Sequence, residues 1–292
     1  MKTYVPKFIT LCVLILICIF GCKKDKENEI LSEFNHRIVS EKMFTNIDQL
    51  DYETTYEYSG NKLSRILAYD QEVEFNFQYP DNNTITFDYT EDIEGIYEGS
   101  GRISLSNNKV SEIVFDNETK AVYNYNSDGK IATIKHFDYD ESWILYEEDI
   151  FTYSSGKLIQ IKSSYPYEVP VSEYKYVYSY NGDELKENIY SHREDENPWI
   201  EDSKLVYSYN FGKISKITFL YNNQVTWLDE GFEEYTYDAD GNLIEIYNSK
   251  YDERTVYSYE EGSGNYRQIF DFAIEPVDFE IDYKPDLGPI PN

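Results

Sequence analysis

Hydrophobic and polar positions follow one repeated pattern along most of the chain. An aromatic-x-Tyr pair is followed within a few residues by a turn, then Lys or Asn, then Leu or Ile, with Ile three positions later. Clear copies start at Tyr56, Tyr123, Phe151, Tyr178, Tyr207, Tyr235 and Tyr257, and the last six are 28, 27, 29, 28 and 22 residues apart. Degenerate copies start at Phe75 and Ile103. A fixed period of this length indicates a repeat architecture.

Each copy has the features of a β-hairpin. In Tyr-x-Tyr both rings point to the same side of a strand. Asn, Asp and Gly at the centre accept the positive φ that tight hairpins need. The period divides into two strands of about 10 residues and two turns of about 4. The pattern therefore predicts an all-β fold, a long antiparallel meander of about 16–20 strands built from repeated hairpins, with a first strand near Arg37–Phe44.

A sheet of this size is expected to curl and close. Large sheets twist, and unpaired edges invite aggregation, so we expect a closed or rolled, wide soluble barrel (porin-like), with an open twisted repeat sheet as the alternative. A transmembrane barrel is not favoured, because charges occupy both faces of strands such as Ser172-Glu173-Tyr174-Lys175-Tyr176. Leu158 and Ile161, three residues apart, face opposite sides of an ideal strand. Either a bulge intervenes, or both faces are buried near the turn.

The N-terminus does not follow the repeat. Two lysines precede the apolar run Phe8–Phe20, which has the length of a signal-peptide core and is too short to span a membrane. The run ends in Ile19-Phe20-Gly21-Cys22, which resembles a bacterial lipobox with Cys22 as the lipidated residue. We expect a lipoprotein signal peptide (1–21), a charged tether (22–35), a hairpin-repeat domain (36–283) and a Pro-rich tail (284–292).

The charged residues that follow Cys22 indicate where the protein is displayed. They resemble the export signal that directs lipoproteins of Bacteroidota to the outer face of the outer membrane. The resemblance favours the cell surface over the periplasmic face, with the membrane bound through the lipid on Cys22. The other cysteines, Cys12 and Cys18, lie in the expected signal peptide. The mature chain is therefore expected to have no internal disulfide and no cysteine site.

One copy of the repeat resembles a known motif. Tyr237-Asp238-Ala239-Asp240-Gly241-Asn242-Leu243 is similar to the core of the tyrosine-aspartate (YD, Rhs-type) repeat. With its anchor, tether and about eight hairpins, the chain resembles an uncharacterised lipoprotein family of Bacteroidota described as having a porin-like fold. Most copies replace the Asp by Asn, Ser or Glu. The resemblance therefore implies a shared fold, with no activity or site residues to carry over.

Composition narrows the classes of partner. The chain has 55 acidic and 26 basic residues, a formal net charge of −29. Loss of residues 1–21, with two lysines and no acids, makes the charge 24 − 55 = −31. Nucleic acid is excluded as a partner, because phosphate binding needs a basic face. Aromatic residues make up 17% of the chain and apolar residues 41%, so it can bury a core and is not predicted to be disordered.

Candidate chemistry is sparse. His36, His136 and His192 are far apart and lack the spacing of metal ligands. Acidic pairs carry no signal in a chain with 55 acids. The stretch Asp238–Glu245 is rich in oxygen ligands, but hairpin turn chemistry explains the same residues. We therefore expect no enzyme activity, no metal site and no cofactor.

The 31 tyrosines leave two interpretations open. They form cross-strand aromatic ladders within the sheet, or they form a wet surface that binds glycan or protein. The candidate ligand-binding residues are Trp143, Tyr146, Trp199 and Trp227, with the connections Tyr139–Tyr146 and His192–Ile200 as the favoured place. The functional hypothesis is a lipid-anchored, non-enzymatic envelope protein that binds glycan or protein. The alternative is a structural envelope protein with no small ligand.

Overall fold

A computed structural model describes residues 36–45, 49–68, 73–91, 96–107, 109–166 and 171–262. The expected signal peptide, tether, lipidated Cys22 and Pro-rich tail lie outside these ranges. None of the described segments is a helix long and apolar enough to cross a membrane. The described elements are the strands β1 (His36–Thr45), β2 (Gln49–Ser59), β3 (Lys62–Ala68), β4 (Val73–Asp81), β5 (Thr84–Glu91), β6 (Tyr97–Ser106), β7 (Lys109–Phe115), β8 (Thr119–Tyr125), β9 (Ile131–Asp140), β10 (Ser142–Ser154), β11 (Lys157–Tyr165), β12 (Ser172–Asn181), β13 (Glu184–Glu194), β14 (Ile200–Asn210), β15 (Lys213–Asn222), β16 (Trp227–Tyr237), β17 (Leu243–Asn248) and β18 (Glu253–Glu261).

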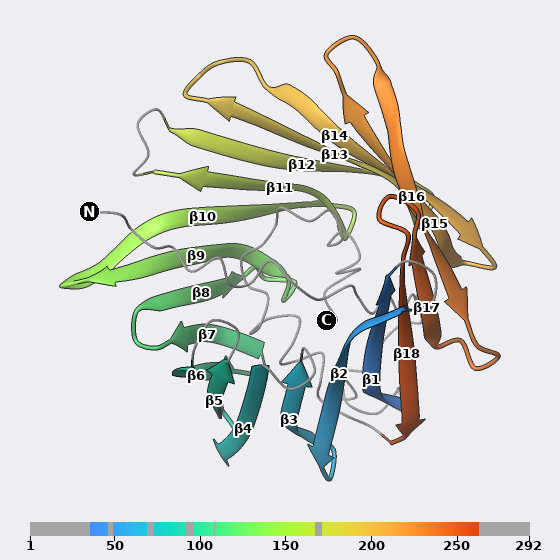
Figure 1. Cartoon of the computed structure of the whole chain (residues 1–292). Helices are drawn as coiled ribbons and strands as arrows, with labels where there is room; N and C mark the ends of the chain where they lie inside the picture. The colour runs from blue at the N-terminus through green and yellow to red at the C-terminus, as the bar shows by residue number, and fades with distance from the viewer. Residues whose placement is uncertain are drawn as a thin grey trace.

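The strands form a closed up-and-down barrel of 18 strands (Figure 1). Each strand pairs antiparallel with the next one along the chain. The first strand β1 also pairs with the last strand β18, with Arg37 opposite Glu260 and Phe44 opposite Arg254. The blue and red ends of the ribbon therefore lie side by side in Figure 1. The antiparallel meander and the first strand near Arg37–Phe44 are confirmed, and the β1–β18 pairing excludes the open twisted sheet.

The two ends of the barrel come from different parts of the repeat. One end holds the turns inside the repeats, from β2–β3 to β16–β17, and we call it the turn rim. The other end holds the links between repeats, from β1–β2 to β17–β18, and we call it the connection rim. Strand β1 begins and strand β18 ends at the turn rim. The chain therefore enters and leaves the barrel at the same end.

A β-bulge after the turn resolves the question of side-chain direction. In the first repeat Tyr58 lies opposite Leu63 and Glu57 lies opposite Arg65, so Ser64 is an extra residue. The same register shift occurs in β10–β11, β12–β13, β14–β15 and β16–β17. Leu63 and Ile66 therefore point to one face, where they are 0% and 2% exposed. The Ser64 hydroxyl donates to the Glu57 carbonyl at 3.0 Å, which bonds the bulge to the opposite strand.

One face of the barrel wall is buried and the other is charged. The first Tyr of each repeat and the Leu and Ile after the turn share the buried face. The strands form one closed layer, and no described residue covers its outer side, so we place the buried face inside the barrel. The outward face has cross-strand ion pairs at Lys42–Glu53, Arg65–Glu74, Arg102–Glu112, Lys135–Glu148, Lys162–Glu173, Lys216–Glu234 and Arg254–Glu245.

The buried face changes in character along the strands. Near the turn rim it is apolar, with residues such as Leu63, Ile131, Ile214 and Leu243 at 1% exposure or less. Toward the connection rim it also contains buried polar side chains, namely Glu41, Thr54, His136, Glu147, Asp149, Ser163, Asn188, Glu233, Asn248 and Thr255. The continuous apolar core therefore belongs mainly to the half of the barrel at the turn rim.

Lysine and tyrosine side chains join successive repeats at the turn rim. The lysine after one turn donates to a glycine carbonyl in the next turn, at Lys109–Gly129, Lys130–Gly156, Lys157–Gly182 and Lys213–Gly241. The Lys213 ammonium also lies 4.8 Å from the centre of the Tyr237 ring. Hydroxyls of tyrosines donate back to carbonyls of the preceding repeat at 2.7–2.8 Å, at Tyr79–Leu63, Tyr125–Val110, Tyr180–Leu158 and Tyr259–Leu243. We call this lysine–tyrosine–carbonyl contact the clamp. It gives the repeated Lys and second Tyr a structural role.

Candidate functional site

Exposed hydrophobic side chains gather at the connection rim. Among the described residues, twelve large hydrophobic side chains are exposed, and nine of them lie at or next to a link of this rim. The nine are Leu50, Ile96, Tyr97, Tyr139, Ile200, Tyr221, Val225, Leu228 and Tyr251. Of the remaining three, Ile150 and Val177 lie in mid-strand and Phe211 lies at the turn rim. Exposed apolar side chains that gather at one end of a protein are candidates for a contact surface.

The densest part of this surface lies between β14 and β16. Tyr221 pairs with Leu228 across β15 and β16, and both side chains are 45% exposed. Val225, in the link between these strands, is 91% exposed. Ile200 opens β14 and is 41% exposed. We call Ile200, Tyr221, Val225 and Leu228 the rim patch. Sequence reasoning missed them, although each lies at a strand end within a few residues of Trp199 or Trp227.

Trp199 lies beside the rim patch under two cationic side chains. The Lys175 ammonium is 4.2 Å from the centre of the indole, and the Arg193 guanidinium carbon is 4.6 Å from it. Burial lowers the pKa of Lys175, Glu201 acts in the opposite sense, and Arg193 adds to the lowering. Cation–π contacts of this kind hold the link between β13 and β14 against β12.

Trp227 and Trp143 are held in the same manner at two other links. The Lys204 ammonium lies 4.5 Å from the centre of the Trp227 ring. The Lys120 ammonium lies 4.4 Å from the Trp143 ring. Trp143 also packs edge-on against Tyr139, with ring centres 5.2 Å apart. Each of the three indoles is therefore part of a packed aromatic–cation unit on the wall.

Tyr146 lies in a different environment. It is the extra residue of a bulge in β10, because Leu145 lies opposite Phe137 and Glu147 lies opposite His136. Its ring centre is 5.9 Å from that of His136. Burial raises the pKa of the Tyr146 hydroxyl, and neighbouring carboxylates add to the rise.

The candidate residues do not converge on one cavity-like site. Trp143, Trp199 and Trp227 belong to three separate links of the connection rim, namely β9–β10, β13–β14 and β15–β16. Tyr146 lies further down the wall. What the structure does bring together is the rim patch, with Trp199 and Trp227 at the two links on either side of β14 and β15.

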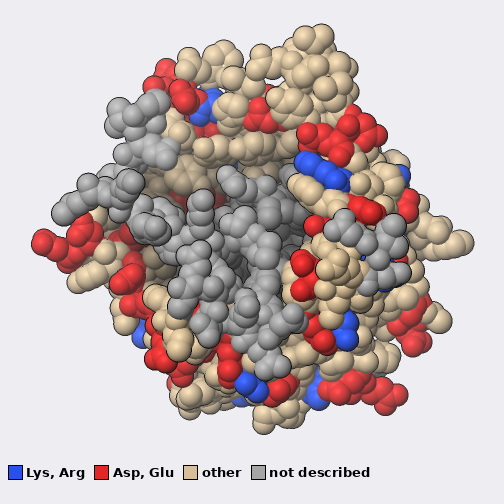
Figure 2. Space-filling model, in the orientation of Figure 1, with Lys and Arg blue, Asp and Glu red and all other residues tan. Residues whose placement is uncertain are grey.

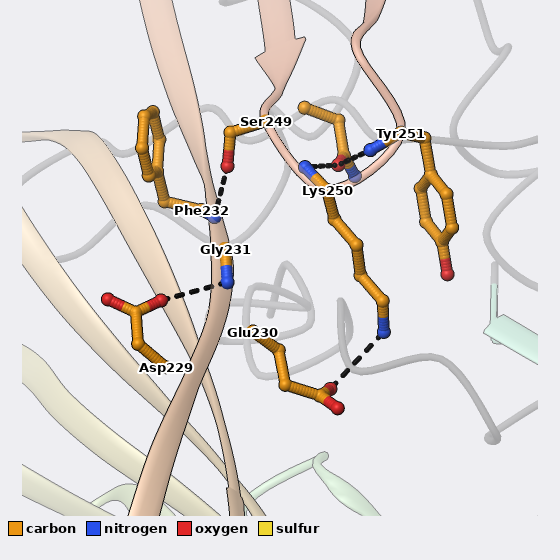
Figure 3. Close-up of polar contacts among 8 residues, drawn as sticks. Asp229, Glu230, Gly231, Phe232, Ser249, Lys250 and Tyr251 are labelled. Atoms are coloured by element: carbon orange, nitrogen blue, oxygen red, sulfur yellow. Dashed lines mark hydrogen bonds and ion pairs between the residues drawn. The ribbon is translucent and has the colours of Figure 1, made fainter.

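A brace of polar contacts fixes the rim next to the patch (Figure 3). The Gly231 amide donates to Asp229 at 2.9 Å, and the Phe232 amide donates to the Ser249 hydroxyl at 2.7 Å. The Lys250 ammonium donates to Glu230 at 3.2 Å. The turn between β17 and β18 is thereby bonded to β16 at its bulge. The strand that carries Trp227 and Leu228 therefore has a fixed position.

A Ser, a His and an Asp do meet inside the barrel. Asp149 lies in the centre, 3.0 Å from the Nε2 atom of His136, and it also accepts a hydrogen bond from Ser163. The serine hydroxyl thus faces the carboxylate, whereas a nucleophilic serine needs its hydroxyl on the imidazole. All three are 3% exposed or less. This order and this burial fit a satisfied polar network in the wall.

Comparison with solved structures gives likenesses of low identity. The chain is similar to a porin-like protein from Bacteroides uniformis, with 13% identity and a TM-score of 0.42, over 79% of this chain and 98% of that one. It is also similar to a porin-like protein from Bacteroides vulgatus, with 10% identity and a TM-score of 0.39, over 76% of this chain and 98% of that one. No family model and no curated protein matches the chain. The fold assignment accordingly rests on the strand pairings given above.

Within the described residues, no group of three or more His, Cys, Asp and Glu side chains is arranged to hold a metal ion. The oxygen-rich stretch that starts at Asp238 forms a turn. The Asp238 carboxylate accepts hydrogen bonds from the backbone amide and the side-chain amide of Asn242, both at 2.8 Å. Burial would raise the pKa of Asp238, but these hydrogen bonds hold it below its ordinary value. The Asp and Asn of the YD-like motif thus close the hairpin.

Proposed function

We propose that the protein is a non-enzymatic barrel of the cell envelope, anchored through a lipid on Cys22, which contacts a glycan or a protein through its connection rim. The observation that carries the proposal is the asymmetry of the exposed hydrophobic side chains. Nine lie at the connection rim and one at the turn rim of the described chain. A purely structural barrel would not require exposed hydrophobic side chains to be concentrated at one rim.

The charge on the wall supports a barrel surrounded by water. Cross-strand ion pairs cover the outward face, with Lys42–Glu53 at 3.3 Å and Lys135–Glu148 at 3.1 Å as examples. Charged side chains at mid-membrane depth on a lipid-facing strand cost about 2–4 kcal/mol each. On the face shown in Figure 2, acidic side chains outnumber basic ones and are spread around the edge of the molecule. Such a surface favours solubility.

The place where the chain enters the barrel supports an orientation. Strand β1 begins at His36 on the turn rim, and 13 residues separate it from the membrane anchor if Cys22 is lipidated. Strands of about ten residues, tilted as in barrels, separate the rims by about 25 Å. The turn rim then faces the membrane, and the connection rim, with the rim patch, points away from it.

A structural envelope protein with no small ligand is the second candidate. The packing of the three indoles under lysines favours it, because ring faces used within the wall are not open platforms. The two proposals differ in what they expect of the rim patch. The binding proposal uses it as the contact surface, whereas the structural proposal gives it no role, and the contacts of the described residues show none.

A binding screen with matched variants tests the proposal. The full chain with Cys22→Ala would be screened against glycans, polysaccharides and envelope proteins, beside the double variant Val225→Ser/Leu228→Ser. The control is Phe211→Ser, an equally exposed hydrophobic side chain at the other rim. We expect a ligand whose binding is lost in the double variant and kept in the control. Binding that survives the double variant would show that the rim patch is not the binding surface, and a blank screen would favour the structural alternative.

Localisation has its own test. We propose display on the outer face of the outer membrane, so protease added to intact cells should remove the barrel. Cys22→Ala should release the protein from the membrane fraction. Protection from protease in intact cells would place the barrel on the periplasmic face, and unchanged fractionation of Cys22→Ala would contradict lipid anchoring.

A further inference from the structure

Phe211 stands at the tip of the β14–β15 hairpin in an unusual state. Its side chain is 99% exposed. Its φ is +51° and that of Gly212 is +77°, so both residues of the two-residue turn are left-handed. Such turns favour Asn or Asp followed by Gly, and a bulky residue at positive φ is an outlier. An outlier of this kind, with a fully exposed aromatic ring, calls for a functional explanation.

A second hairpin shows that the turn itself does not need the ring. The β10–β11 turn has Ser155 at φ +50° and Gly156 at φ +79°, which is the same backbone conformation. A small polar residue therefore fills the position that Phe211 fills four strands later. The other turns of the turn rim contain Gly, Asn, Asp, Ser and Ala at their tips. Phe211 is the one large hydrophobic side chain exposed at this rim in the described residues.

The position of Phe211 relative to the chain ends suggests its partner. The hairpin tip lies on the rim at which β1 begins and β18 ends. Under the orientation given in the proposed function, this rim faces the membrane that holds the anchor. Aromatic side chains insert at the boundary between headgroups and acyl chains. With a net charge of −29, the protein is not drawn to anionic lipid by charge, so the contact depends on the ring.

We propose that Phe211 inserts into the interface of the lipid bilayer and makes the β14–β15 hairpin a second membrane contact of the anchored barrel. The inference rests on the proposed orientation. A single ring would not hold a free protein on a membrane. In a tethered protein the ring meets the bilayer at high effective concentration, so it fixes how the barrel stands.

The test uses the lipidated mature protein in phosphatidylcholine vesicles that contain lipids brominated in their acyl chains, which quench nearby indoles. Phe211→Trp and Ser155→Trp place an indole on two hairpins with the same backbone. We expect several-fold stronger quenching and a blue-shifted emission for Phe211→Trp. Urea unfolding confirms that both variants keep the fold. Quenching of Phe211→Trp no stronger than that of Ser155→Trp overturns the proposal.

The unmodified protein separates failure of this proposal from failure of the orientation. Its native Trp143, Trp199 and Trp227 all lie at the connection rim. If they stay unquenched while Phe211→Trp is quenched, both the orientation and the hairpin contact hold. If they stay unquenched and the two variants are quenched equally, the orientation holds and the Phe211 contact is wrong. If the native indoles are quenched, the connection rim faces the lipid and both proposals fall.

Discussion

The two rims of this barrel are built from the same strands and are under different constraints. At the turn rim, most turns have two residues, and clamps of lysine, tyrosine and a glycine carbonyl join four pairs of successive turns. At the connection rim, links range from one residue at Glu141 to six at 166–171. Apolar side chains are left exposed there. The comparison teaches that the repeat specifies the turn rim and leaves the connection rim free to vary.

The core follows the same division. The buried face is apolar beside the turns and includes carboxylates, amides and hydroxyls toward the links. Apolar burial supplies most of the stability of a fold, so the turn half should contribute more of it. Substitutions in the two halves should therefore differ in their cost to stability.

The largest effect is expected from shortening a side chain in the turn half. Ile214 is 0% exposed, so Ile214→Ala removes buried methyl groups and leaves a cavity. The free energy of unfolding should fall by about 3 kcal/mol. Leu228, at the connection rim, is 45% exposed, and Leu228→Ala should cost less than about 0.5 kcal/mol. Urea titration of both variants checks the pair, and equal losses would contradict the division of the core.

The next effect concerns one glycine from each rim. Gly231 has φ +129°, and a Cβ there would lie 3.3 Å from the Lys250 Cα atom and 3.0 Å from the Ser249 hydroxyl. Gly231→Ala should cost about 2–3 kcal/mol, because conformational strain and crowding add. Gly212, with φ +77° and open space around it, should cost about 1 kcal/mol when changed to Ala. If Gly231→Ala cost no more than Gly212→Ala, the Ser249 and Lys250 side of the brace would have to shift easily to make room for the added methyl group.

The clamp itself should have a smaller, measurable effect. Lys213 donates to the Gly241 carbonyl at 2.8 Å and lies over the Tyr237 ring. Lys213→Met keeps the length of the side chain and loses both contacts, at a cost of about 1–2 kcal/mol. The control is Lys186→Met, since Lys186 is 60% exposed and its pair with Glu187 spans 3.7 Å; its cost should stay below about 0.5 kcal/mol. Indistinguishable midpoints of the two variants in thermal unfolding would show that the clamp does not stabilise the barrel.

The smallest effect concerns the Glu173 carboxylate near Trp199, and it depends on pH. Burial would raise the pKa of Glu173, but hydrogen bonds from Lys162 and Arg193 outweigh it and hold the pKa below its ordinary value. A depressed carboxyl pKa stabilises the fold above the unfolded-state pKa of about 4.3, and this contribution is lost as pH falls through the folded-state pKa. The stability difference between the protein and Glu173→Gln should be full at about pH 6 and shrink below about pH 4. A difference of less than about 1 kcal/mol is expected, and one that grew on acidification would refute the pairing.

Much of the fold could be predicted from the sequence, because each repeat contains the local signals of a β-hairpin. The Tyr-x-Tyr pairs and the turn residues mark each hairpin, and their number predicts the strand count. The bulge was one of two alternatives that the Leu and Ile spacing left open. The sequence could not decide between them, because the extra residue is Ser64 in one repeat, Ile159 in another and Lys186 in a third, so no residue type marks it. Side-chain direction after each turn therefore had to come from the pairing register.

The candidate site was predicted less well, for a physical reason. The indoles are visible in the sequence, but the lysines that lie over them come from neighbouring strands and meet them only when the strands pair. The rim patch likewise depends on which strand ends share one end of the barrel. Val225 and Leu228 look like ordinary strand residues until the ring of strands places them beside Tyr221.

We propose that the connection rim is the free end of an anchored barrel. If Cys12 and Cys18 leave with the expected signal peptide and Cys22 is lipidated, no free thiol remains, so single introduced cysteines can be labelled cleanly. Ser127→Cys reports the turn rim and Thr226→Cys the connection rim, and energy transfer to headgroup-labelled lipid measures the distance of each from the bilayer. We expect the label at residue 127 to lie closer to the lipid than the label at residue 226, by about 25 Å. Equal distances, or the reverse order, would contradict it.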